Sequence, residues 1–168
     1  MSHQTNNKSI TAETRNLVEA LAAFANRSDV AEALKVAHRV ATDKLQADSA
    51  SSAAVETLEL EVFTDVPAEV GTIRVAVIRE GFDGGFERHS NSTQVLLSLD
   101  GSGETHVHTA QGWRVDRYGK GASLEDRWHV VPQAVWHKSA APGPGNWTVV
   151  AFHTARDVQD EFVDERPA

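Results

Sequence analysis

The sequence predicts an all-β fold, an antiparallel barrel that follows two helices near the N-terminus. Residues 11–45 have apolar side chains at three- and four-residue spacing, which is typical of amphipathic helices. From residue 55 the pattern changes to short runs rich in Val, Trp and Thr, separated by Gly, Asp or Pro. Such runs are typical of a β-sandwich or barrel. Because no helical pattern separates them, a parallel α/β sheet is not expected.

The two predicted helices each have one apolar stripe. The first stripe consists of Leu17, Val18, Leu21, Phe24 and Ala25. Residues 26–29 interrupt it, and Asp29 with Glu32 resembles a capping box at the start of the second helix. The second stripe consists of Val30, Leu34, Ala37, Ala41 and Leu45. We expect this hairpin to pack on the main domain or on another subunit, as in a homodimer.

The chain is predicted to have three parts. Residues 1–54 form the helical extension and a linker, and the polar residues 1–10 are expected to fray. Residues 55–158 form the barrel, and the acidic residues 159–168 form a surface tail. Leu58, Leu60 and Val62 alternate along the first strand. Further strands are expected in the runs at 72–78, 94–99, 104–109, 112–118, 127–132, 134–139 and 147–153.

Composition limits the classes of function. The chain has 168 residues, a net charge of −8 and no cysteine, so disulfides, thiolate metal sites and cysteine nucleophiles are excluded. Without a Lys/Arg cluster, nucleic-acid binding is not expected. The apolar runs are too short for a membrane span, and residues 1–10 lack the features of a secretory signal. We therefore expect a cytoplasmic location, with which the absence of cysteine is compatible.

The segment from Gly81 to Gly101 concentrates groups that can bind a metal. Glu87 and His89 are two residues apart, so on a strand their side chains point to the same face. Gln94 follows five residues later and offers an amide oxygen. Imidazole, carboxylate and amide oxygen are all known metal ligands, so this segment is a candidate metal site.

Two spaced motifs are similar to those of the cupin superfamily. The first is Gly81-x5-Glu87-x-His89-x4-Gln94-x6-Gly101, and the second is Pro132-x-Ala134-x2-His137. The cupin motifs are G-x5-H-x-H-x3-4-E-x6-G and G-x5-P-x-G-x2-H-x3-N. The resemblance covers roughly residues 60–155 and implies a jelly-roll barrel with one divalent metal.

The resemblance implies a metal site made of Glu87, His89, Gln94 and His137. His89 and His137 match family histidines, whereas Glu87 stands in place of a His and Gln94 in place of the Glu. The carboxylate has thus moved within the site, and two His with one carboxylate suffice for Zn or non-haem Fe(II). Three further positions depart from the second motif, where Asp126, Ala134 and Ala141 replace Gly, Gly and Asn.

Two functions follow from the resemblance. One is a metal-dependent enzyme using Fe, Zn, Mn or Ni on a small organic molecule, with dioxygenase chemistry first and isomerase or lyase chemistry next. The other is a metal-free cupin that binds a small ligand or has a regulatory role, in which the four polar side chains hydrogen-bond one another. The sequence identifies neither a catalytic residue nor a substrate, and leaves open whether the protein is an enzyme.

Other histidines and aromatic residues have simpler interpretations. His106 and His108 are expected to be solvated on one strand face and to stay apart from the site. His129 and His153 are expected to be core or rim residues with satisfied hydrogen bonds. The aromatic residues beside the motifs are expected mostly in the core, with one or two at the barrel mouth: Phe82, Phe86, Trp128 and Trp136.

Overall fold

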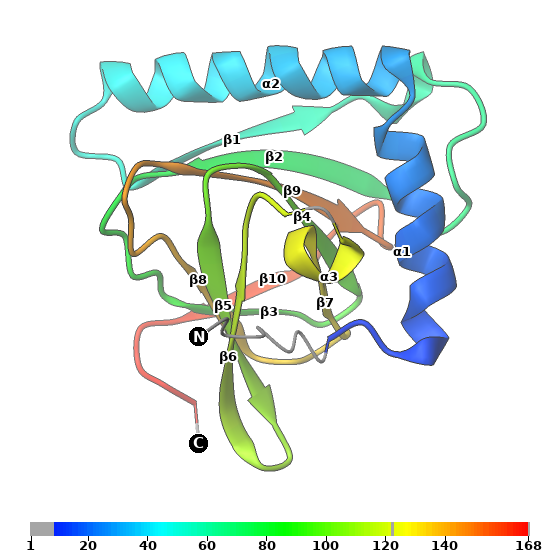
Figure 1. Cartoon of the computed structure of the whole chain (residues 1–168). Helices are drawn as coiled ribbons and strands as arrows, with labels where there is room; N and C mark the ends of the chain where they lie inside the picture. Colours follow the sequence, from blue (N-terminus) through cyan, green and yellow to red (C-terminus); the bar gives the residue numbers. More distant parts are fainter. Residues whose placement is uncertain (1–8, 122, 168) are drawn as a thin grey trace.

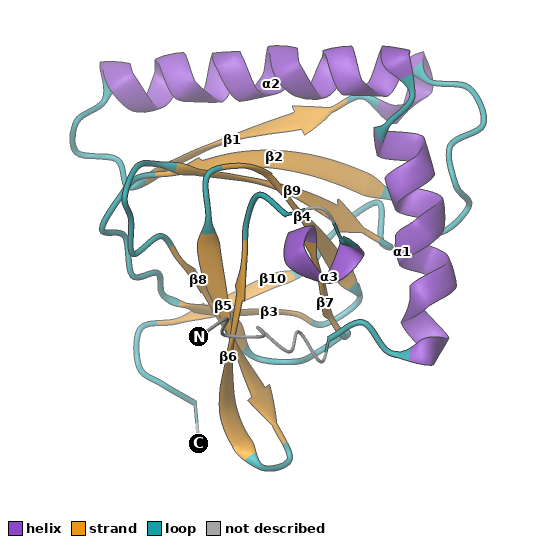
Figure 2. Ribbon diagram, viewed as in Figure 1, coloured by secondary structure: helices purple, strands orange, loops and turns teal. Residues whose placement is uncertain are grey.

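The computed structural model describes residues 9–121 and 123–167. Within these residues ten strands form two antiparallel sheets that face each other (Figures 1 and 2). The first sheet has the strand order β1 (Ala53–Leu58), β2 (Thr72–Ile78), β9 (Trp147–His153), β4 (Gln94–Asp100) and β7 (Trp128–Val131). The second has the order β10 (Asp160–Val163), β3 (Phe86–His89), β8 (His137–Ala140), β5 (Gly103–Thr109) and β6 (Gly112–Tyr118).

Two helices, α1 (Ala12–Ala25) and α2 (Ser28–Ala47), cover the outer face of the first sheet (Figure 1). Four of the five residues in the first predicted stripe are buried, and all five in the second. They pack on outward-facing residues of the sheet, including Val95, Val150 and Phe152. The predicted hairpin therefore lies on the main domain, and burial of its stripe is the main source of its stability.

The first helix starts as predicted, whereas the capping signal predicted for the second helix is wrong. Thr11 is the N-cap of α1 and forms a capping box with Thr14. The capping box predicted at Asp29 and Glu32 is wrong, because α2 begins at Ser28 after the N-cap Arg27. The carboxylate of Asp29 instead accepts a hydrogen bond of 2.6 Å from the Arg27 guanidinium, and as an acidic residue in the first turn it favours the helix dipole.

A second apolar cluster fills the space between the two sheets. It includes Leu96, Trp147 and Val149 from the first sheet and Tyr118 from the second. The indole of Trp147 donates a hydrogen bond of 3.0 Å to Ser98, so its polar atom is satisfied in the core. This cluster forms the apolar core between the sheets, and some of its residues, including Leu96 and Val149, also line the pocket described below.

Two local predictions in the barrel are wrong. The alternation expected through Val62 ends at Leu58, where the chain enters a 3₁₀ helix, η1 (Leu60–Val62), and Val62 is 68% exposed. A short helix, α3 (Leu124–Arg127), also precedes β7, where no helix was expected. It starts with a capping box between Ser123 and Asp126, which gives Asp126 a structural role at its altered motif position.

The prediction that residues 1–10 fray falls mostly on residues outside the described range, and the structure adds contacts at both ends of the chain that were not predicted. Residues 1–8 lie outside the described residues, but Ser9 is buried and accepts a hydrogen bond of 3.1 Å from the backbone of Val130. The predicted tail contains strand β10, which pairs with β3. Among the described residues, no helix combines the length and apolarity that a membrane crossing requires.

Candidate metal centre

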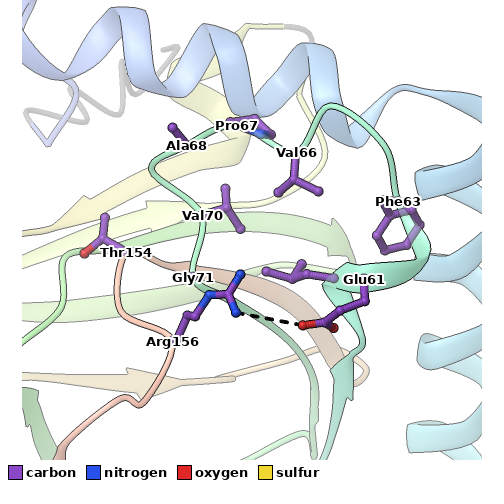
Figure 3. A pocket seen from close by; sticks show the side chains of 10 residues that line it. Glu61, Phe63, Val66, Pro67, Ala68, Val70, Gly71, Thr154 and Arg156 are labelled. Carbon is purple, nitrogen blue, oxygen red and sulfur yellow. Dashed lines mark ion pairs between the residues drawn. The ribbon is translucent and has the colours of Figure 1, made fainter.

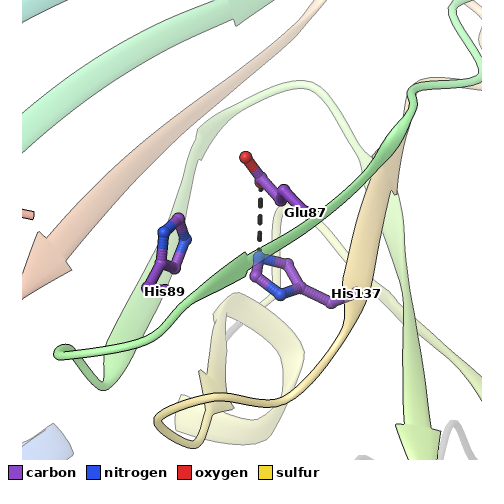
Figure 4. A group of neighbouring side chains, drawn as sticks. All are labelled: Glu87, His89 and His137. Atoms are coloured by element: carbon purple, nitrogen blue, oxygen red, sulfur yellow. Dashed lines mark ion pairs between the residues drawn. The ribbon is translucent and has the colours of Figure 1, made fainter. Parts of the chain in front are cut away.

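Cross-strand pairing brings Glu87, His89 and His137 together at one end of the barrel. Glu87 and His137 are directly opposite each other on β3 and β8, and such pairs have adjacent side chains. His89 is two residues from Glu87 on β3 and therefore shares its face. One ligand atom from each residue lies within 4.8 Å of the others, and the side chains converge on one space (Figure 4).

The ring of His137 is fixed by a backbone hydrogen bond. Its Nδ1 lies 3.0 Å from the carbonyl oxygen of Val135, which can only accept, so Nδ1 carries the proton. The Nε2 atom of the neutral ring is then a lone-pair donor. It lies 3.3 Å from Oε1 of Glu87 without hydrogen-bond geometry, and among the described residues it has no hydrogen-bond partner.

The ring of His89 is fixed by a carboxylate from the C-terminal strand. Asp160 is directly opposite His89 in the pairing of β3 with β10, and its Oδ1 accepts a hydrogen bond of 2.8 Å from Nδ1. The other oxygen of Asp160 forms a 3.0 Å ion pair with Arg74 of β2. The Nε2 atom of His89 is buried and has no partner within the described chain. Metal-binding histidines commonly have this carboxylate support.

The first sheet contributes Gln94 and His153 from the opposite side of the space. These residues are directly opposite each other on β4 and β9, and their side chains are 6% and 1% exposed. The His153 ring packs edge-on against the ring of His89, with 4.8 Å between centroids. In residues 9–121 and 123–167, Oε1 of Gln94 and both ring nitrogens of His153 lack hydrogen-bond partners.

Burial and mutual proximity shift the pKa values of the site residues. Burial acts to raise the pKa of Glu87, but the neighbouring His137, His89 and His153 outweigh it and hold the pKa below the ordinary value. Burial lowers the pKa of His89, although Glu87 opposes the shift. Burial, together with His89 and Arg74, lowers the pKa of His153 to about 3. These shifts favour an ionised Glu87 and neutral imidazoles at His89 and His153, and ionised carboxylates and neutral imidazoles are the forms that bind metals.

A pocket of about 370 Å³ extends from these polar groups between the sheets. Glu87, His89, Gln94 and His153 line one part of it. The rest of the lining is mostly apolar. Its two aromatic residues are Phe82, which is half-buried, and Phe162, which lies on the exposed C-terminal strand β10. The other apolar lining residues are Ala53, Val55, Ala76, Ile78, Leu96, Val149 and Ala151. This volume is within the range of small-molecule sites.

The remaining histidines lie apart from this cluster. His106 contacts Glu104 with 2.9 Å between Nε2 and Oε1, and His108 packs on Trp113. Neither is among the three residues whose ligand atoms converge.

The prediction that His129 and His153 have satisfied hydrogen bonds is wrong, because both are buried and all four ring nitrogens lack hydrogen-bond partners among the described residues.

The turn residues of the two motifs adopt left-handed backbone conformations. Gly81 and Gly101 have φ values of 81° and 73°, which glycine tolerates without steric cost. Ala134, which replaces a motif glycine, has a φ of 60° in the turn before His137. This conformation is strained for a residue with a Cβ atom. The chain therefore keeps the shape of the turn without the glycine that usually allows it.

Sequence reasoning missed three residues of the site. Asp160 was assigned to the tail, His153 to the core or rim, and Arg74 received no role. The period of two along β9 does place His153 on the same face as Val149 and Ala151. This periodicity alone does not place His153 at the site, because the pairing of His153 with Gln94 depends on the strand register.

Another cavity, of about 500 Å³, lies beside η1 (Figure 3). Glu61 and Arg156 form its ion pair at 4.0 Å, but both side chains are more than three-quarters exposed. Phe63, Val66 and Val70 supply its apolar surface. A solvent-exposed ion pair of this length contributes little, and we assign no chemistry to this cavity.

Comparison with solved structures identifies the fold. No family model and no curated protein matches the sequence. Bacillus subtilis oxalate decarboxylase, a protein with Mn(II) centres, superposes with a TM-score of 0.55 and 13% identity over 68% of this chain. Brassica napus procruciferin, an 11S globulin, superposes with a TM-score of 0.53 and 16% identity over 67%. The chain has the cupin fold.

The proteins with similar structures differ in the share of their length that the match covers and in their described roles. The match spans only 29% of the oxalate decarboxylase and 28% of the globulin. Peruvianin-I, described as a cysteine peptidase from Thevetia peruviana latex, matches with a TM-score of 0.55 and 16% identity over 67% of this chain and 68% of its own. At these identities the likeness establishes the jelly-roll fold, and the function must be argued from the site.

Proposed function

We propose that this protein is a metal-dependent cupin enzyme that acts on a small organic molecule, with Glu87, His89 and His137 as the metal ligands. The main support is the convergence of their three ligand atoms within 4.8 Å of one another. Two imidazoles and a carboxylate are an established donor set for Zn and for non-haem Fe(II). Oxalate decarboxylase, with its Mn(II) centres, adds Mn to the metals worth testing.

The ring nitrogens without hydrogen-bond partners support a bound cation. His137 and His89 each use Nδ1 for a protein hydrogen bond, which leaves both Nε2 lone pairs without partners among the described residues. Buried acceptors without partners are costly. The Nε2 of His137 also lies 3.3 Å from a carboxylate oxygen, so two acceptors approach each other when the ring is neutral. A cation bound by all three residues removes both problems.

Gln94 is proposed as a weak fourth ligand. Its Oε1 atom is buried beside the cluster and has no hydrogen-bond partner within the described residues. An amide oxygen is a weaker donor than an imidazole or a carboxylate, and water can replace it. Gln94 lies on the first sheet, whereas the three proposed ligands lie on the second. It can therefore bind the same ion only if the two sheets are correctly placed relative to each other.

The site suits a reaction in which a bound metal would polarise a substrate oxygen or assist oxidation of the substrate by dioxygen. A divalent metal supplies Lewis-acid or redox chemistry at a coordination position that the protein leaves open. The protein residues hold the ligand atoms in place and surround the substrate with an apolar pocket that limits water. We propose dioxygenase chemistry first, and isomerase or lyase chemistry next. Because the chain has no cysteine, it lacks the nucleophile of a cysteine peptidase.

A metal-free binding protein is the alternative, and one contact favours it. If His137 is protonated, its Nε2 forms an ion pair with Glu87 at 3.3 Å without any metal. The pocket would then bind a small ligand with no reaction. Metal content distinguishes this alternative from the proposed enzyme directly.

Elemental analysis tests the proposal. Protein purified without chelator and supplemented with Zn, Mn, Fe or Ni should contain about one ion per chain. His89→Ala and His137→Ala should each abolish stoichiometric metal, whereas Gln94→Ala should only weaken binding. His108→Ala is the matched control, because His108 lies on β5 outside the cluster. Full metal retention in both His variants would overturn the ligand assignment.

Activity is then sought with the metal-loaded protein. An aerobic screen of small organic acids and alcohols that records oxygen consumption tests the dioxygenase class. Product analysis of the same reactions by mass spectrometry tests the isomerase and lyase classes. Metal-free wild-type protein after supplementation with all four ions would favour the binding protein instead.

A further inference from the structure

His153 is a buried polar residue of the pocket whose ring nitrogens the proposed metal site leaves without hydrogen-bond partners. A cation held by the three ligands, with Gln94 as a weak fourth, accounts for three orphaned atoms: Nε2 of His89, Nε2 of His137 and Oε1 of Gln94. Both nitrogens of His153 remain without partners among the described residues, although the side chain is only 1% exposed. Its ligand atoms also lie outside the group that converges within 4.8 Å. A molecule bound in the pocket can supply a hydrogen-bond partner to His153.

The position of His153 suits contact with a molecule bound beside the metal. Its ring lies against the ring of His89, and it lines the pocket together with Glu87 and Gln94. A neutral imidazole has one N–H donor and one acceptor nitrogen. It can therefore bond to a hydroxyl, carbonyl or carboxylate oxygen. Arg74 is a nearby cation, but its guanidinium forms an ion pair with Asp160, which in turn accepts a hydrogen bond from His89. His153 is therefore the better candidate to contact the ligand.

The remainder of the pocket defines the other part of the ligand. From His153 the inner face of the first sheet continues through Ala151, Leu96, Ala76 and Ile78, all of which line the cavity. These residues offer no hydrogen bonds from their side chains, so an apolar group is favoured there. The volume of about 370 Å³ leaves room for a body of several carbon atoms beyond the polar head.

We propose that His153 binds the oxygen-bearing head of a small ligand whose apolar body lies against Ala76, Leu96 and Ala151. This inference rests on the proposed function, because the metal site proposed there determines where the head of the ligand lies. With one divalent ion and the single carboxylate of Glu87, the centre has a net positive charge, so a head with an anionic oxygen is favoured. The ligand class is thus a small organic acid or enol with an aliphatic or aromatic body.

Alkyl hydroxamates are suitable probes, because they combine an anionic metal-binding oxygen with a variable apolar chain. Acetohydroxamate, butyrohydroxamate and hexanohydroxamate are titrated into the zinc-loaded protein by calorimetry. Each buried methylene should strengthen binding by about fourfold. His153→Leu should keep stoichiometric zinc but bind every probe roughly tenfold more weakly, because a hydrogen bond to a charged group is lost.

Two variants serve as matched controls. His129→Leu replaces an equally buried histidine whose ring nitrogens form no hydrogen bond within the described residues and which does not line this pocket, and it should bind all three probes like the wild type. Ala76→Phe fills the apolar part of the pocket. It should leave acetohydroxamate binding intact and remove the gain from longer chains.

The outcomes separate this inference from the proposed function. Wild-type affinity in zinc-loaded His153→Leu, or the absence of any chain-length effect, would overturn the inference while the metal site stands. If the wild-type protein takes up none of the four ions Zn, Mn, Fe and Ni, the proposed function fails, and the titration is repeated on the metal-free protein. If the metal-free wild type then binds hexanohydroxamate more tightly than His153→Leu does, the assignment of His153 and the apolar pocket to ligand binding stands. If the wild type does not bind it, that assignment is wrong.

Discussion

The two faces of the first sheet differ in composition and in role. On β9, Val150 and Phe152 point outward into an apolar cluster covered by α1 and α2, whereas Ala151 and His153 point inward and line the pocket. The same division occurs on β4, where Val95 is packed and Gln94 is polar and unpartnered among the described residues. The period of two along a strand therefore lets one segment support stability on one face and chemistry on the other.

The largest expected effect is on the helix-covered face. Phe152→Ala removes a large buried side chain that stacks on Trp128 with 5.7 Å between ring centroids. We expect the free energy of unfolding to fall by about 3–5 kcal/mol, as measured by denaturant titration. Metal stoichiometry of the folded fraction should not change. Loss of metal with unchanged stability would contradict the division of roles between the faces.

The next effect concerns the support of His89. Asp160→Asn keeps the size of the side chain but removes the charge that fixes the His89 ring and pairs with Arg74. Metal affinity should fall by about 10- to 100-fold, the usual range when such a supporting carboxylate is lost. Competition with a chelator of known affinity measures this change. Glu161→Gln is the matched control, because Glu161 pairs with Arg88 on the other face of the strand.

A third effect appears in the acid stability of the barrel. Burial, with Arg114 and His137, lowers the pKa of His129 to about 3, whereas the unfolded value is 6.5. Between these values the unfolded chain binds the extra proton, so stability falls as the pH drops below 6.5. At about pH 5 the loss is roughly 2 kcal/mol from this group. His129→Leu should remove that part of the pH dependence in urea titrations, and an unchanged slope would contradict the assignment.

The smallest expected effect is at the turn before His137. Ala134 has a φ of 60°, and glycine adopts this conformation without the steric cost that a Cβ atom brings. Ala134→Gly should therefore raise the free energy of unfolding by about 1 kcal/mol, less any entropy gained by the unfolded chain. Ala110→Gly gives a comparison at another turn position. A destabilised Ala134→Gly variant would mean that the turn contributes no strain.

Periodic patterns predicted most of the fold. The apolar stripes of α1 and α2 and the run that forms β2 appear as expected, because burial of one face leaves a regular trace in the sequence. The errors lie where local signals are short or ambiguous. Asp29 and Glu32 have cap-like spacing, but the helix begins one residue before Asp29. The four-residue strand β10 is mostly exposed and so carries no hydrophobic pattern.

The candidate site was predictable only in part. Glu87, His89, Gln94 and His137 were found because motif spacing is local to two segments, and the structure brings Glu87, His89 and His137 together. Asp160 and His153 reach the site through strand pairing with β3 and β4. Strand register depends on the packing of the whole barrel, and one sequence does not reveal it.

The pairing of β3 with β8 has a consequence for local opening. In the described chain a single residue pair, Glu87 with His137, defines this register, and both residues are proposed metal ligands. An ion bound there would join two strands that share few backbone contacts, and it would stabilise the closed state by mass action. Amide hydrogen exchange should therefore slow on metal addition in β3 and its neighbour β10. It should change little in β4 and β9, which pair without a register shift from Gln94 to Ser98.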